Sequence, residues 1–129
     1  MIYVVDDDLA VLKSLRFLLE TEGFEVRTFR SGSALLESSI PYSADCLVVD
    51  YKMAGIDGLE LTKRLRGLGF DAPIILITGH PDASILTKAH SAGVYQVVLK
   101  PDLQDNLVEH VRNAIDSMPP PRESGKSPP

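Results

Sequence analysis

Acidic residues gather directly behind an apolar run at the start of the chain. Asp6, Asp7 and Asp8 follow the segment "MIYVV", and Asp50 follows another apolar segment, "CLVV". Carboxylates that lie close together raise each other's pKa unless a cation keeps them ionised. Because oxygen ligands that leave room for water and phosphate suit Mg²⁺, or Mn²⁺ in its place, the acids indicate a divalent-cation site.

Two further polar residues stand at the ends of apolar segments. Thr78 ends "IILIT", and Lys100 follows "YQVVL". A carboxylate beside Mg²⁺ can act as a nucleophile that attacks a phosphoryl donor and becomes an aspartyl phosphate. An ammonium group and a hydroxyl group can then hold the phosphoryl oxygens. The residue types therefore indicate phosphoryl transfer to an aspartate.

Strands and helices alternate along the chain, and this order would bring the polar residues together. Apolar runs predict strands, and leucines, valines and isoleucines at helical spacing predict a helix after each of them. Five β–α units in succession favour a parallel sheet with helices on both faces and right-handed crossovers. In such α/β sheets ligands bind beyond the carboxyl ends of the strands. The predicted strands are 1–5, 25–29, 46–49, 74–78 and 95–99.

Composition limits the class of protein. The chain has 129 residues, which is enough for one domain with a substantial core. Its net charge of −5 argues against direct binding of nucleic acid by this segment. No apolar run is long enough for a membrane span, and the start lacks the features of a signal peptide. The single cysteine, Cys46, cannot form an internal disulfide, so we expect a cytoplasmic protein without membrane contact.

The end of the chain departs from the alternating pattern. The last thirteen residues, "SMPPPRESGKSPP", hold five of the nine prolines and show no apolar periodicity. Such composition is typical of a linker or a disordered tail. We therefore expect one domain over residues 1–117 and a proline-rich linker or tail over 118–129.

Four short segments carry a family resemblance. "VVDDD", "LVVDYKMAGIDG", "IILITG" and "VVLKP" occur in an order and at spacings that resemble the receiver domains of response regulators in two-component signalling. The N-terminal segment is most similar to FixJ-type transcriptional regulators. The resemblance covers about residues 1–117 and implies an α/β flavodoxin-like (CheY-like) fold. Its five-stranded parallel sheet would have the order 2-1-3-4-5.

The resemblance also assigns roles to residues of the acidic cluster. It implies that Asp50 is the phosphoacceptor and that Asp6, Asp7 and Asp50 hold Mg²⁺. Of the neighbouring acids Asp6 and Asp7, Asp7 would be the direct ligand, and Asp6 would act partly through water. The backbone carbonyl of Lys52 would be a further ligand. Thr78 and Lys100 would contact the phosphoryl group.

The implied function is a switch driven by phosphorylation. A sensor histidine kinase, or a small phosphodonor, would phosphorylate Asp50. The face from about 83 to 116 would then change its preference for partners or form a homodimer. Transcription control and contact with DNA would belong to a C-terminal domain outside this chain. The chain itself would catalyse only its own phosphorylation and dephosphorylation.

Several residues are better explained without this chemistry or depart from the family pattern. Asp8 is well placed as a helix N-cap, and Asp57, before Gly58, as a turn or cap residue. The family usually has proline where this chain has Ala54, and an aromatic switch residue where it has Val97. Tyr95 lies two residues before Val97, so on a strand it would share a face with it and either take a related role or simply pack.

Two other functions stay open at this point. A receiver-like domain that binds partners without phosphorylation is compatible with Val97 and Ala54. A Mg²⁺-dependent phosphatase of the haloacid-dehalogenase type also uses an aspartate at a strand end. That class needs a second aspartate two residues after the nucleophile, where this chain has Lys52.

Overall fold

Alternating strands and helices build the part of the chain that the computed structural model describes, which is residues 1–38, 44–79, 83–100 and 103–117. The strands are β1 (Ile2–Val5), β2 (Val26–Phe29), β3 (Cys46–Asp50), β4 (Ile74–Thr78) and β5 (Gln96–Leu99). The helices are α1 (Leu9–Thr21), α2 (Gly32–Glu37), α3 (Gly58–Gly67), α4 (Ala83–Ala92) and α5 (Leu103–Ser117). Pro101, the last residue of the motif "VVLKP", and the predicted linker or tail 118–129 lie outside the described residues.

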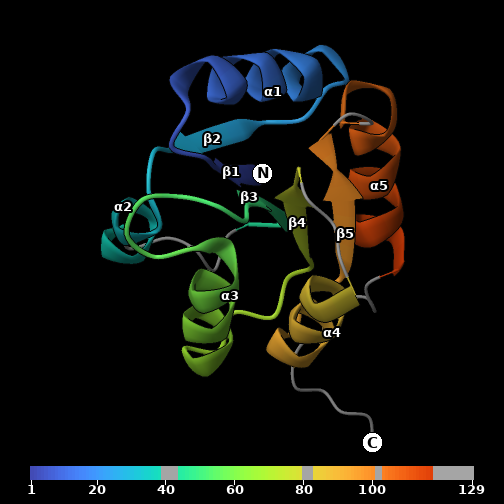
Figure 1. The fold of residues 1–129 in the computed structure, drawn as a ribbon. Coiled ribbons are helices and arrows are strands. Elements are labelled where there is room, and N and C mark those ends of the chain that lie inside the picture. Colours follow the sequence, from blue (N-terminus) through green and yellow to red (C-terminus); the bar gives the residue numbers. More distant parts are fainter. Residues whose placement is uncertain (39–43, 80–82, 101–102, 118–129) are drawn as a thin grey trace, which may run out of the picture.

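The strands form one parallel sheet with the order β2-β1-β3-β4-β5. This confirms the predicted fold class and strand order. The three strands in the middle of the sheet, β1, β3 and β4, are buried along their whole length because helices cover both faces. Figure 1 shows α1 and α5 on one face and α2, α3 and α4 on the other.

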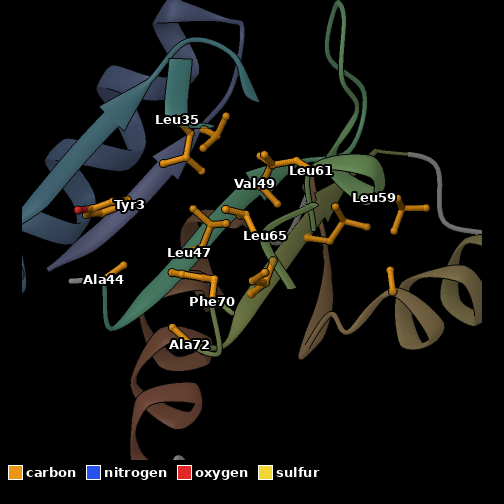
Figure 2. Packing of buried hydrophobic residues seen from close by; sticks show 14 of the residues in the cluster. Tyr3, Leu35, Ala44, Leu47, Val49, Leu59, Leu61, Leu65, Phe70 and Ala72 are labelled. Carbon is orange, nitrogen blue, oxygen red and sulfur yellow. The ribbon is translucent and has the colours of Figure 1, made fainter. Parts of the chain in front are cut away.

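Each face of the sheet has its own apolar core. Alternate residues of a strand point to opposite faces, so Val4 and Val48 lie in the core beneath α1 and α5, whereas Leu47 and Val49 lie in the core beneath α2, α3 and α4. Figure 2 shows the second core, in which helix side chains such as Leu65 pack onto the sheet. Two layers of helices therefore hold the strands in fixed register, and the register aligns the carboxyl ends of the strands.

Side-chain caps fix the starts of the helices that follow β1 and β3. Asp8 accepts hydrogen bonds from the backbone N–H groups of Ala10 and Val11 at the start of α1. Asp57 accepts one from the backbone N–H of Glu60 at the start of α3. Both acids satisfy N–H groups that have no partner within the helix. The prediction that they are caps is confirmed.

The last strand begins one residue later than the sequence predicts. Tyr95 precedes β5 and is 43% exposed, although its backbone N–H still donates to the carbonyl of Ile74 (2.8 Å). Gly93, with a φ of 97°, turns the chain just before this point. Val97 lies within β5 and packs against the core beneath α4. The prediction that Tyr95 belongs to the strand is therefore wrong by one residue.

No helix within the described ranges combines the length and the apolar character that crossing a bilayer requires.

Candidate functional site

The register of the sheet brings the predicted site residues to one edge. Val5 of β1 pairs with Val49 of β3, so Asp6 and Asp50 follow paired residues on neighbouring strands. On the other side of β3, Asp50 pairs with Ile77 of β4, one residue before Thr78. Residues far apart in the sequence therefore meet beyond the carboxyl ends of the central strands, as expected for a parallel α/β sheet.

Three carboxylates form the centre of this edge. One oxygen from each of Asp6, Asp7 and Asp50 lies within 4.8 Å of the others. Asp6 and Asp50 are buried, with exposed fractions of 1% and 3%, whereas Asp7 is exposed. The sequence-based prediction that these acids come together agrees with the geometry.

The two oxygens of the buried Asp6 carboxylate differ in their hydrogen bonding within the part of the chain that the structure describes. Its Oδ1 accepts a hydrogen bond from the backbone N–H of Asp8 (2.9 Å). Its Oδ2 is buried and has no hydrogen-bond partner among the described residues. A buried polar atom without a partner costs free energy, and native structures rarely leave one unsatisfied. An unsatisfied oxygen beside two other carboxylates fits a hard divalent cation that prefers oxygen ligands.

Lys100 and Thr78 complete the cluster of polar residues at this edge. The Nζ atom of Lys100 lies 3.1 Å from Oδ1 of Asp50. Thr78, the last residue of β4, is 2% exposed and pairs with Leu99, which directly precedes Lys100. A hydroxyl group and a cation therefore stand at the carboxyl ends of β4 and β5, the two strands that come after β3 in the sheet order.

Burial and mutual repulsion change the pKa values of these groups. Burial raises the pKa of Asp6 to about 6, and the charge of Asp50 adds to this effect. Burial also raises the pKa of Asp50, although the hydrogen bond and the charge of Lys100 oppose the rise. Partial burial lowers the pKa of Lys100, but its contact with Asp50 outweighs this, so the net shift is upward. The cluster is therefore costly to keep ionised without a further cation.

The loop between β3 and α3 forms one wall of the site. Lys52 lies in this loop and, together with Asp7, lines a groove of about 420 Å³. The other lining residues are Tyr51, Met53, Ala54, Gly55 and Asp57. Lys52 and the exposed Asp7 therefore border the same groove.

Two features of the site were missed by the sequence analysis. A Cβ atom at Gly58 would lie 2.6 Å from the backbone oxygen of Asp50 and 2.7 Å from the side chain of Leu76. Only glycine therefore lets α3 begin this close to the end of β3. A glycine directly after a capping acid is a signal that could have indicated this close approach. The second feature is the backbone N–H of Ala54, which donates to Oδ2 of Asp7 (2.9 Å).

Comparison with known proteins decides the family. A family model described as "Response regulator receiver domain" matches residues 2–112. The chain belongs to this family. Receiver domains are signalling domains and not enzymes in the usual sense, so the phosphatase alternative loses its support.

Two curated relatives are called transcriptional or response regulators. The transcriptional regulatory protein FixJ of Bradyrhizobium diazoefficiens is 37% identical over 123 residues, which cover 95% of this chain and 60% of FixJ. The response regulator protein TmoT of Ectopseudomonas mendocina is 36% identical, over 96% of this chain and 56% of TmoT. The chain thus spans less than two thirds of the length of these relatives.

Solved structures agree with the family. The crystal structure of FixJ-N has a TM-score of 0.80 and 32% identity, with 92% of this chain and 94% of that chain covered. A response regulator receiver domain protein from Clostridium thermocellum has a TM-score of 0.81 and 28% identity, with 89% and 93% covered. The resemblance to receiver domains, and to the FixJ type in particular, is confirmed.

Proposed function

We propose that this receiver domain is switched by Mg²⁺-dependent phosphorylation of Asp50. The observation that supports this best is the convergence of three carboxylates within 4.8 Å, with the ammonium group of Lys100 3.1 Å from Asp50. Asp50 is the member of the cluster that combines burial, a lysine partner and a place at the end of the middle strand of the sheet.

The metal site would use oxygen ligands from two strand ends and one loop. Asp6, Asp7 and Asp50 would supply carboxylates, and the backbone carbonyl of Lys52 would supply a neutral oxygen. The buried Oδ2 of Asp6, which lacks a hydrogen-bond partner among the described residues, supports this assignment. When bound, Mg²⁺, or Mn²⁺ as a substitute, would neutralise negative charge on the acids and on the phosphoryl group.

The side chains of this chain would carry out the transfer itself. An oxygen of the Asp50 carboxylate attacks the phosphorus atom of the donor and forms a P–O bond. The bond from phosphorus to the leaving group breaks, and its electron pair leaves with that group. Lys100, which contacts the carboxylate of Asp50, then also binds an oxygen of the new phosphoryl group. The hydroxyl of Thr78 donates to another phosphoryl oxygen. Hydrolysis of the acyl phosphate by water would reverse the modification.

Phosphorylation would be read at the β5 edge of the sheet. Thr78 ends β4 and Lys100 directly follows β5, so their movement toward the phosphoryl group would shift the elements of the face 83–116. This face would change its preference for partners or form a homodimer. To convert a population that is mostly off to mostly on, the phosphoryl group must favour the active state by about 5 kcal/mol. Contacts of a doubly charged group with a cation and a hydroxyl can contribute on that scale.

The partners follow from the family and from the relatives' names. The donor would be the phosphohistidine of a sensor histidine kinase in the cytoplasm. Because FixJ is a transcriptional regulatory protein of which this chain spans 60%, we propose that the parent chain controls transcription through a separate C-terminal domain. Residues 1–117 would be the receiver domain, and 118–129 would link it to that domain.

A second function has one specific observation in its favour. Val97 occupies the position of the usual aromatic switch and packs against the core, while the nearby Tyr95 precedes β5 and is 43% exposed. This arrangement favours a readout that does not depend on a rotating aromatic side chain. In its extreme form the domain would bind partners without phosphorylation.

Intact-mass spectrometry after incubation with acetyl phosphate and MgCl₂ tests the proposal. The wild type should gain one phosphoryl group, and it should gain none when EDTA replaces MgCl₂. The variant Asp50→Asn should gain none under either condition. Asp57→Asn is the matched control, because it removes the same charge nearby while asparagine can still cap α3. Equal labelling of wild type and Asp50→Asn would refute the site, and no labelling of either would favour the phosphorylation-independent function.

A further inference from the structure

A backbone group in the β3–α3 loop holds one acid of the cluster. The N–H of Ala54 donates to Oδ2 of Asp7 at 2.9 Å, across a separation of 47 residues in the sequence. Asp7 is exposed and follows β1, whereas Ala54 lies four residues beyond Asp50. This hydrogen bond therefore connects the segment after β1 with the loop after β3 at the mouth of the site.

The same bond secures the middle of the loop. At its start, the backbone N–H of Tyr51 donates to the carbonyl of Ile77 (2.8 Å). At its end, the N–H of Gly58 donates to the carbonyl of Tyr51 (2.9 Å). Between these two anchors the chain turns at Gly55, whose φ is 79°. Met53 and Ile56 pack against the core on either side of this turn, and the bond from Ala54 ties the loop between them to Asp7.

We infer that the backbone N–H of Ala54 is a positioning group for the metal site. It fixes the position of the Asp7 carboxylate before a cation binds. It also fixes the carbonyl of Lys52, which lies two residues earlier in the same loop. This inference rests on the proposed function, since it assumes that these oxygens are ligands. A carboxylate has enough lone pairs to accept this N–H and still bind a cation. Ligands ordered in advance lose less entropy on binding, so the N–H raises the affinity for Mg²⁺.

The identity of residue 54 decides whether this bond exists. Proline has no backbone N–H and cannot donate here, whereas any other residue can. Ala54 is exposed, so its side chain has little packing to lose. The receiver pattern that the chain resembles usually has proline at this position, which indicates that such a loop accommodates it. Ala54→Pro therefore removes the donor, and Ala54→Ser is the matched control that keeps it.

An NMR titration with MgCl₂ measures the effect on affinity. The amide signals of Asp50 and Gly58 report binding without any need for phosphorylation. The dissociation constant for Mg²⁺ should rise about fivefold in Ala54→Pro, the effect of losing one ordinary hydrogen bond, and change less than twofold in Ala54→Ser. Equal affinity of Ala54→Pro and wild type would overturn the inference while leaving the proposed function intact. Absence of Mg²⁺ binding by the wild type would overturn both.

Hydrogen exchange in the wild type provides a test that needs no variant. Linkage is reciprocal, so a bond that raises Mg²⁺ affinity about fivefold is itself stabilised about fivefold by bound Mg²⁺. Exchange of the Ala54 amide at constant pH should therefore slow about fivefold between EDTA and saturating MgCl₂. An exchange rate that stays the same or rises while Mg²⁺ binds would show that the bond does not position the ligands.

Discussion

In the absence of a metal ion, the negative charge of Asp6 should make the folded protein less stable than a variant without this charge. Asp6 is almost completely buried, and burial together with the charge of Asp50 raises its pKa to about 6. Replacing Asp6 with asparagine removes the charge but keeps an oxygen that can accept the hydrogen bond from Asp8. The variant Asp6→Asn should therefore be more stable than the wild type in EDTA at neutral pH.

The size and pH dependence of this gain follow from the pKa. A pKa of about 6 in the folded state, against 3.8 for the ordinary side chain, corresponds to about 3 kcal/mol at most. Because the pKa is raised on folding, the folded wild type binds this proton more tightly than the unfolded chain does. The free-energy cost of ionised Asp6 in the folded state is absent below pH 3.8, grows as pH rises and is complete above pH 6. The advantage of the variant should thus fall to about half by pH 5.

Urea unfolding followed by circular dichroism measures the free energy of unfolding at pH 7.5 and pH 5 in EDTA. Asp8→Asn is the matched control, because it removes an exposed charge two residues away and asparagine caps helices as well as aspartate does. In MgCl₂ the difference in free energy of unfolding between wild type and Asp6→Asn should become smaller. The folded wild type keeps the Asp6 carboxylate and binds Mg²⁺ better, and a ligand stabilises the state that binds it. If Asp6→Asn is no more stable than Asp8→Asn at pH 7.5 in EDTA, the reasoning about this carboxylate is wrong.

Two further substitutions test the framework around the site. Arg66→Ala should lower the free energy of unfolding by about 2 kcal/mol, since the guanidinium donates to the carbonyls of Phe70, Ala72 and Gly93; an unchanged urea midpoint would contradict this. Gly58→Ala should cost about 2 kcal/mol and slow phosphorylation by acetyl phosphate, because its Cβ would meet the backbone oxygen of Asp50. Gly67→Ala in the same helix has open space around it and should not destabilise the chain, so equal losses in both variants would refute the steric explanation.

Much of the fold and the grouping of the acids could be predicted because they depend on strong local patterns. The apolar runs that end at Val5 and Val49 are central strands, and a parallel sheet brings their carboxyl ends together. The caps at Asp8 and Asp57 were predictable because a short acid before a helix has few better roles.

Other features depend on details that residue types do not encode. The bond from Ala54 to Asp7 uses a backbone N–H, which every residue except proline has, so no residue type indicates it. That Oδ2 of Asp6 has no hydrogen-bond partner within the described ranges depends on the orientation of one buried side chain. The start of β5 at Gln96 depends on how the turn at Gly93 directs the chain, and the sequence pattern alone placed it one residue too early.

The central claim is that Asp50 accepts a phosphoryl group beside a bound Mg²⁺. A crystal structure of the protein with MgCl₂ and beryllofluoride, a stable mimic of the phosphoryl group, tests it most directly. The account predicts beryllium bonded to a carboxylate oxygen of Asp50, Mg²⁺ between Asp6, Asp7 and Asp50, and both Thr78 and Lys100 in contact with fluoride. An unmodified Asp50 that points away from Asp6 and Asp7, with no ion among them at saturating MgCl₂, would contradict it.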